Sequence, residues 1–300
     1  MHLHQLLVGA AGLLALTAAR PAAAQSPLPV IHLYQGKAPG SESWAQPEKE
    51  LYSPIFRAQG VYNVVSPTLT VVAPAAGAGK GTGVIVCPGG GFQALSINQE
   101  GFDVARQLAA RGFTCFVLKY RVLQNAGADP AQEMAAVSAD SKAHYQAVQP
   151  VIRLALADGL RAVAYVREHA AQYGLSPRRV GLLGFSAGGT LVASVACNYT
   201  SATRPAFVAP VYLQYDWVIR QSIPADAPPL FLLVAGDDQF GLAPHSVRLY
   251  NDWTAAHQLA ELHVFARGGH GFGMKKQNLP SDNWLTLFVS WLGTPGLLEK

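Results

Sequence analysis

Ser186 lies in the run Gly184-Phe185-Ser186-Ala187-Gly188-Gly189, and the residues on either side give this run its meaning. Residues 180–183 are apolar and predict a buried strand, whereas residues 190–196 are compatible with a helix. A G-x-S-x-G pentad between a strand and a helix is typical of a sharp turn that pushes the serine hydroxyl out of the sheet. Small neighbours are needed because the strand and the helix approach closely there. The pentad therefore predicts a strand–turn–helix unit that presents Ser186.

Apolar strand-like segments alternate with helix-like segments along most of the chain. We expect strands at residues 63–72, 83–87, 114–118, 180–183, 207–212, 230–235 and 261–265, and helices at 98–111, 156–171, 190–196, 245–257 and 282–292. This alternation predicts a mostly parallel sheet covered by helices on both faces. No internal repeat and no linker is visible, so we predict one α/β domain over residues 25–300.

Two segments depart from the alternation. Residues 123–150 are alanine-rich and polar, and we expect an insertion above the sheet with a short helix at 131–144. Residues 31–62 are rich in Pro, Gly and Ser, which predicts an irregular lead-in or an edge strand rather than a separate domain.

The composition favours a large globular core and argues against several kinds of partner. The 300 residues are 50% hydrophobic and 13% charged, and the net charge of +4 is spread along the chain without a basic run, so we predict no nucleic-acid partner. Cys87, Cys115 and Cys197 are odd in number and lie in apolar stretches, which predicts buried thiols rather than a disulfide framework. The chain has no C-x-x-C, and its 9 histidines fall at no ligand spacing. We therefore predict neither a metal nor a cofactor.

The first residues resemble an export signal rather than part of a domain. Residues 6–19 form an apolar segment that is short for a membrane span, and Ala22-Ala23-Ala24 supplies small residues at the spacing of a cleavage site. We predict a cleaved signal peptide over residues 1–24 and a secreted or periplasmic mature protein without a membrane segment. The n-region, residues 1–5, lacks lysine and arginine, and a retained membrane anchor is the alternative.

A serine nucleophile needs a base within hydrogen-bond reach and a third group that orients the base. Gly268-Gly269-His270-Gly271-Phe272-Gly273 follows the expected strand at 261–265, and its glycines indicate a sharply bent loop that presents the His270 ring. His263 lies within that strand and predicts a packed or edge histidine. We therefore predict His270 as the base.

The acid is expected in the loop Gly236-Asp237-Asp238-Gln239, after the strand at 230–235. Both Asp237 and Asp238 qualify, and we favour Asp238 because the first acidic residue of such a turn often bonds to the backbone of its own loop. The order Ser, Asp, His along the chain is the order found in α/β-hydrolases.

An early glycine-rich loop supplies candidates for an oxyanion hole. Pro88-Gly89-Gly90-Gly91-Phe92 follows the expected strand at 83–87, and its glycines let backbone N–H groups converge without a side chain in the way. We predict that Gly90 and Gly91, with Ala187, donate to the oxyanion of an acyl-transfer reaction. A phosphate-binding loop is the alternative, but the run matches neither G-x-G-x-x-G nor G-x-x-x-x-G-K-S/T.

These motifs, in this order, resemble the secreted acetyl-esterase and acetylxylan-esterase-like α/β-hydrolases, which are related to feruloyl-esterase-like and dienelactone-hydrolase-like proteins. Asn63-Val64 with residues 67–71, Glu100-Gly101, Leu118-Lys119-Tyr120-Arg121 and Glu261-Leu262-His263 also carry the resemblance. Serine stands where dienelactone hydrolases proper have cysteine. The loop 237–244 is two residues longer than the D-D-x-x-V-P of many relatives, which leaves both acids open.

The resemblance implies an α/β-hydrolase fold and hydrolysis of short-chain acetyl esters, commonly of carbohydrates such as acetylated xylan. Ser186, His270 and Asp238 would form the triad, and a small-molecule or oligosaccharide ester would be the substrate. A peptidase on the same fold and an inactive carbohydrate-binding scaffold are the alternatives. The chain shows no gating domain typical of such a peptidase, and an intact Ser, Asp and His argues against the scaffold. The oligomeric state has no signal in the sequence.

Overall fold

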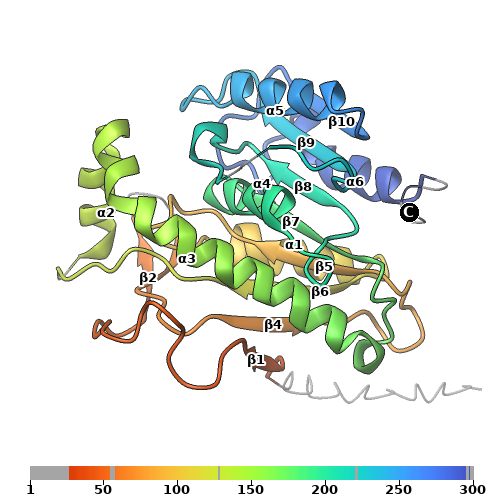
Figure 1. Ribbon diagram of the computed structural model, residues 1–300. Coiled ribbons are helices and arrows are strands. Elements are labelled where there is room, and N and C mark those ends of the chain that lie inside the picture. The colour runs from red at the N-terminus through yellow and green to blue at the C-terminus, as the bar shows by residue number, and fades with distance from the viewer. Residues whose placement is uncertain (1–26, 55–57, 128, 220–221, 295–296, 298–300) are drawn as a thin grey trace, which may run out of the picture.

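The computed structural model describes residues 27–54, 58–127, 129–219, 222–294 and 297, and the predicted signal peptide, residues 1–24, lies outside them. An eight-stranded sheet crosses the molecule (Figure 1). Its strand order is β1 (Val30–His32), β4 (Thr68–Val72), β6 (Thr114–Lys119), β5 (Gly83–Cys87), β7 (Val180–Phe185), β8 (Val208–Val211), β9 (Leu230–Ala235) and β10 (Ala260–Phe265). The strands from β6 to β10 in this order are parallel, whereas β1 and β4 pair antiparallel at one edge. The mostly parallel sheet predicted from the sequence is therefore present.

Helices cover both faces of this sheet. In Figure 1, α3 (Ser141–Glu168) and α4 (Ala187–Asn198) lie on one face, and α1 (Asp103–Ala109) and α6 (Trp284–Leu292) lie on the other. α5 (Ala243–Ala255) packs against β9 and β10. β5, β7 and β9 are buried along their whole length, as expected for strands between two helical layers.

Short elements complete the chain. A π-helical turn at Asn98–Phe102 leads into α1, and 3₁₀ turns lie at Ala170–Tyr173, Tyr215–Trp217 and Pro280–Asn283. The lead-in segment includes a small antiparallel hairpin of β2 (Lys49–Ser53) and β3 (Ala58–Tyr62). Among the described residues, no helix combines the length and the apolar character that crossing a membrane requires.

The prediction of one helix over residues 131–144 was wrong, because one helix ends and another begins within that range. α2 (Pro130–Ser138) ends before Asp140, whose side chain caps α3 by accepting the N–H of Ala143 at 2.7 Å. α3 then begins at Ser141 rather than at residue 156. Its first two turns are mostly exposed, and Pro150 lies inside the helix, although proline in a sequence usually marks a helix boundary.

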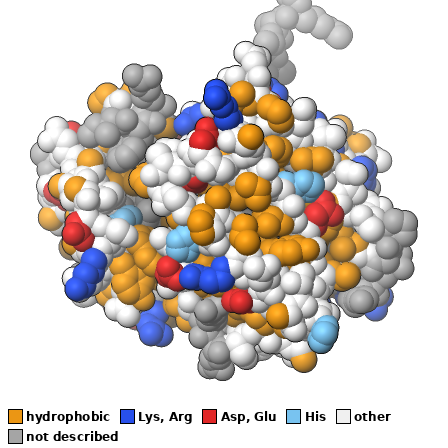
Figure 2. All heavy atoms as spheres, turned by 90° about the horizontal axis from the view of Figure 1, so that it is seen from above, with side chains coloured by type: hydrophobic (Ala, Val, Ile, Leu, Met, Phe, Trp, Pro, Cys, Tyr) orange, Lys and Arg blue, Asp and Glu red, His pale blue; other side chains and the backbone are white. Residues whose placement is uncertain are grey.

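β10 forms the second edge of the sheet and is only half-buried. Figure 2 shows the molecule from above the view of Figure 1, and hydrophobic side chains gather across the middle of the face that is seen there. Val264 on β10 and Leu259 just before it are among the exposed apolar residues. His263 packs against the ring of Phe231, and its Nε2 lies 2.7 Å from Glu261 Oε1, as expected for an edge histidine. Polar pairs of this kind disfavour pairing of an edge strand with another chain.

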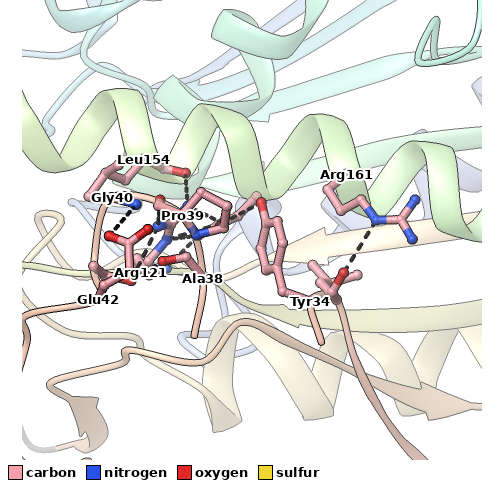
Figure 3. A network of polar contacts seen from close by, with 11 residues as sticks. Tyr34, Ala38, Pro39, Gly40, Glu42, Arg121, Leu154 and Arg161 are labelled. Atoms are coloured by element: carbon pink, nitrogen blue, oxygen red, sulfur yellow. Dashed lines mark hydrogen bonds and ion pairs between the residues drawn. The ribbon is translucent and has the colours of Figure 1, made fainter. Parts of the chain in front are cut away.

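A buried ion pair ties the lead-in segment to the sheet and to α3 (Figure 3). Arg121 follows β6 and donates to the Asp158 carboxylate on α3 through Nε and Nη2, at 2.7 to 3.1 Å. The two side chains are only 1% and 0% exposed. The Tyr34 hydroxyl donates to the same carboxylate at 3.1 Å, and Arg121 Nη1 donates to the Pro39 carbonyl at 2.6 Å. Burial raises the pKa of Tyr34, which keeps its hydroxyl a donor.

Removing water from this buried ion pair costs free energy, so the pair needs hydrogen-bond partners that take the place of the water. A buried charge is stable only where other groups replace its water, and deleting one partner leaves the other charge uncompensated. The lead-in segment supplies three of those groups, the Tyr34 hydroxyl, the Pro39 carbonyl and the Ser41 hydroxyl. The network therefore holds residues 34–39 against α3.

Asp158→Ala is expected to lower the free energy of unfolding by about 3–5 kcal/mol, because Arg121 stays buried without a counter-charge. Urea denaturation followed by circular dichroism measures the change. The matched control is Asp103→Ala, whose partner Arg106 is 59% exposed, and which is expected to cost less than about 1 kcal/mol. Similar losses in the two variants would contradict the structural role of the buried pair.

Candidate active site

Ser186 occupies a strained turn between β7 and α4. Its φ of 52° and ψ of −116° lie in a region that residues with a side chain rarely adopt. A Cβ on Gly184 would lie 2.3 Å from the carbonyl oxygen of Gly188, and a Cβ on Gly188 would lie 2.1 Å from that of Cys87. Only glycine fits these two positions. The backbone N–H of Ser186 donates to the Val211 carbonyl at 2.9 Å, which anchors the turn to β8.

The His270 side chain lies between Ser186 and Asp238. Its Nδ1 is 2.8 Å from Asp238 Oδ2, and its Nε2 is 2.9 Å from Ser186 Oγ. Asp238 is 1% exposed at its side chain and His270 is 12% exposed. Because a carboxylate only accepts, Nδ1–H of the neutral ring donates to Asp238, and Nε2 is left to accept the serine hydroxyl proton. The structure thus brings the three predicted residues together in one line of hydrogen bonds.

Asp237 has a different set of contacts. Its Oδ1 accepts the N–H groups of Gly268 at 2.9 Å and Gly269 at 2.8 Å. Gln239 Oε1 accepts the backbone N–H of His270 at 2.8 Å. The first acid of the turn therefore bonds to a neighbouring loop, and not to its own loop as we expected. Of the two candidates, Asp238 contacts the imidazole, while Asp237 holds the backbone of the loop that carries it.

The glycine-rich loop after β5 lies beside Ser186. Gly90 has a φ of 134° and Gly91 a φ of 63°, and a Cβ on Gly90 would lie 2.1 Å from the Ala94 carbonyl oxygen. No hydrogen bond among the described residues uses the N–H groups of Gly90, Gly91 or Ala187. All three residues line the same cavity as Ser186. Their backbone donors are therefore available to a negatively charged oxygen.

Glu100 and Tyr212 link the loops of the site, and sequence reasoning assigned neither of them a role there. Glu100 is buried, and its carboxylate accepts the N–H of Gly89 at 2.9 Å and the hydroxyl of Tyr212 at 2.7 Å. The Tyr212 hydroxyl accepts the N–H of Gly273 at 3.2 Å, and the ring packs edge-on against His270. Burial raises the pKa of both Glu100 and Tyr212. The only sequence signal for this link was the run Glu100-Gly101, which is one of those that carry the family resemblance.

A cavity of about 530 Å³ opens above Ser186 and His270. The side chains from α2 and from the first turns of α3 that line it are Met134, Ser138, Ser141 and His144. Trp217, from the 3₁₀ turn after β8, packs edge-on against His144, whose Nε2 lies 2.8 Å from the Gly91 carbonyl oxygen. Burial lowers the pKa of His144, which favours the neutral ring as donor to Gly91.

The described part of the chain contains no cluster of three or more His, Cys, Asp or Glu side chains placed to hold a metal ion. The groups that line the cavity next to Ser186 are instead suited to acyl transfer. They comprise a hydroxyl, an imidazole bonded to a carboxylate, and backbone N–H donors.

The chain is similar to known hydrolases in sequence. The model of the Dienelactone hydrolase family matches residues 70–286. An acetylxylan esterase from Xylanibacter ruminicola is 24% identical over 243 residues, which cover 71% of this chain and 45% of that protein. The chain thus spans about half the length of this curated relative.

Solved structures also resemble this one. MGS-M1, an α/β-hydrolase enzyme from a Medee basin deep-sea metagenome library, has a TM-score of 0.61 at 20% identity, covering 85% of this chain and 98% of its own. An acetyl ester-xyloside bifunctional hydrolase from Caldicellulosiruptor lactoaceticus has a TM-score of 0.62 at 21% identity, covering 90% and 97%. These likenesses show the α/β-hydrolase fold, so the predicted fold class is confirmed.

Asp238→Asn is expected to lower kcat for p-nitrophenyl acetate hydrolysis about 10⁴-fold, because an amide at this position no longer favours the productive tautomer of His270. Asp237→Asn is the matched control, one residue away with no contact to the imidazole, and its kcat should fall far less. Steady-state kinetics of the two variants measure the difference. A larger loss in Asp237→Asn would transfer the role of the acid to that residue.

Proposed function

This chain belongs to the dienelactone hydrolase family, and we propose that it is a carboxylic ester hydrolase with Ser186 as nucleophile, His270 as general base and Asp238 as the acid that orients the base. The observation that carries the proposal is the line of contacts from Asp238 Oδ2 through the imidazole to Ser186 Oγ, at 2.8 and 2.9 Å. A strained serine, a base in reach and free backbone donors beside one cavity suit acyl transfer.

The first half of the proposed reaction forms an acyl-enzyme. Ser186 Oγ attacks the ester carbonyl while His270 Nε2 takes the hydroxyl proton, and Asp238 stabilises the resulting imidazolium. The N–H groups of Gly90, Gly91 and Ala187 donate to the developing oxyanion, where the loss of one donor typically costs about 3 kcal/mol of barrier. The tetrahedral intermediate then collapses, and His270 gives its proton to the departing alcohol oxygen.

The second half releases the acid. His270 Nε2 takes a proton from a water molecule as that water attacks the acyl carbonyl on Ser186. The second tetrahedral intermediate expels the Ser186 oxygen, which receives the proton back from His270. The cycle ends with a carboxylic acid and the original hydroxyl, so the reaction requires neither a metal nor a cofactor.

We infer that the substrate carries a short acyl group, acetyl above all, on a carbohydrate such as acetylated xylan. One relative is named an acetylxylan esterase, and another is named an acetyl ester-xyloside bifunctional hydrolase. The part of α2 and α3 that lines the cavity presents Ser138, Ser141 and His144, with Met134 as its one large apolar side chain. An interfacial lid of a lipase would require a larger apolar surface.

The proposed setting of this activity is outside the cytoplasm. It rests on the predicted signal peptide at residues 1–24 and on a single mature domain over residues 25–300. Polymeric or oligomeric sugar esters would be met there, which agrees with the proposed substrate.

The value of kcat/KM is expected to fall by more than about tenfold from p-nitrophenyl acetate to p-nitrophenyl octanoate, because the longer acyl chain is too large for an acyl site that fits acetyl. Release of acetate from acetylated xylan is expected alongside. Ser186→Ala serves as the control, with kcat lower by about 10⁴-fold or more and an unchanged circular dichroism spectrum. Faster hydrolysis of octanoyl esters, or activation at a lipid interface, would overturn the proposed substrate.

A further inference from the structure

Phe240 is an exposed aromatic residue next to the proposed catalytic base. It lies in the loop between β9 and α5, and it is 65% exposed. Its ring centroid is 4.7 Å from that of His270, with the two planes at 80°. The residue also lines the cavity above Ser186. The loop that carries it, residues 237–244, is the one whose length departs from the D-D-x-x-V-P pattern.

The exposure of this ring is fixed by hydrogen bonds. The backbone N–H of Phe240 donates to Asp238 Oδ1 at 2.8 Å, and the N–H of Gly241 donates to the Asp238 carbonyl at 2.9 Å. Gln239, the preceding residue, accepts the backbone N–H of His270. The loop therefore holds the ring at the mouth of the cavity, although burying a phenyl group stabilises a protein by about 1.5–3 kcal/mol. A single exposed apolar residue is ordinary on a protein surface, but this ring also lines the cavity and packs against His270, so its apolar face is open to a ligand bound there.

The proposed reaction determines which part of the substrate lies near this ring. The proton on His270 Nε2 has to reach the departing oxygen, so the alcohol part of the ester lies next to the imidazole. A ring that packs against His270 at the cavity mouth is therefore placed to contact the alcohol and not the acyl group. The cavity of about 530 Å³ leaves room for such a group, because an acetyl group fills only a small part of it.

We propose that Phe240 is the stacking platform of a subsite for a pyranose ring in the alcohol part of the substrate. The inference rests on the proposed ester hydrolase function and adds the group that recognises the sugar. A pyranose has an apolar C–H face that packs on an aromatic ring and hydroxyl groups around its edge. Gln99 and Lys275 also line the cavity and supply hydrogen-bonding groups for those hydroxyls.

The test compares two acetyl esters, an acetylated xylo-oligosaccharide and ethyl acetate, which has no ring. In Phe240→Ala, the ratio of kcat/KM for the oligosaccharide to kcat/KM for ethyl acetate is expected to fall about tenfold, mainly through the KM of the oligosaccharide. Phe240→Tyr keeps the aromatic face and should keep the wild-type ratio. Leu259→Ala removes an exposed apolar side chain that does not line the cavity, and it should also keep the ratio.

The outcomes separate this inference from the proposed function. An unchanged ratio in Phe240→Ala overturns the subsite. The proposed hydrolase function still stands in that case if the wild-type protein hydrolyses both esters. Equal losses of kcat on the two esters also overturn the subsite, because Phe240 would then only support His270. Wild-type hydrolysis of ethyl acetate without hydrolysis of the oligosaccharide would reject the sugar substrate together with its subsite. Hydrolysis of neither ester would reject the hydrolase itself.

Discussion

The turn at Ser186 is the constraint on which the rest of the site depends. The backbone reverses between β7 and α4 within a single residue of positive φ, and the strand and the helix meet there at backbone distance. The absent side chains of Gly184 and Gly188 make this approach possible. Gly188 also lies against the carbonyl of Cys87 at the end of β5, and Ser186 bonds to the end of β8. The ends of three neighbouring strands are therefore fixed around one hydroxyl.

The loops that complete the site are held by side chains rather than by regular structure. Asp237 and Gln239 bond to the backbone around His270, and Glu100 joins the Gly89 backbone to the Tyr212 hydroxyl. Glu100 is buried, where an unsatisfied polar group is costly, so its contacts fix the loop after β5 strongly, whereas Asp237 and Gln239 are exposed and add ordinary hydrogen bonds. The proposed base, its proposed acid and the proposed backbone donors are thereby positioned before any substrate binds, as electrostatic stabilisation of a transition state requires.

Much of this arrangement follows from the sequence. β5 and β9 have the bounds predicted for them, because strands buried on both faces are continuous apolar runs. The loops after β7, β9 and β10 meet because parallel strands place their carboxyl ends at one edge of the sheet. The preference for Asp238 over Asp237 rested on turn chemistry. Asp238 does contact the imidazole, but the reason was wrong, because Asp237 bonds to the loop of His270 and Asp238 itself accepts an N–H of its own loop.

Other features could not be predicted because they depend on contacts between distant residues. Glu100 and Tyr212 are 112 residues apart, and no periodicity links them. The first turns of α3 are mostly exposed, and Pro150 inside the helix is a residue that marks a helix boundary in a sequence. The exposure of Phe240 results from the way in which the Asp238 side chain holds its loop. An aromatic residue in a loop sequence does not reveal that arrangement.

Titration with an organophosphonate ester tests the central claim, that Ser186 is an activated nucleophile, most directly. The account predicts one covalent adduct per chain by intact mass spectrometry, located on Ser186 by peptide mapping, with stoichiometric release of the leaving group. Ser186→Ala should take up no label. No adduct on the folded wild-type protein, or an adduct that persists in Ser186→Ala, would contradict the account.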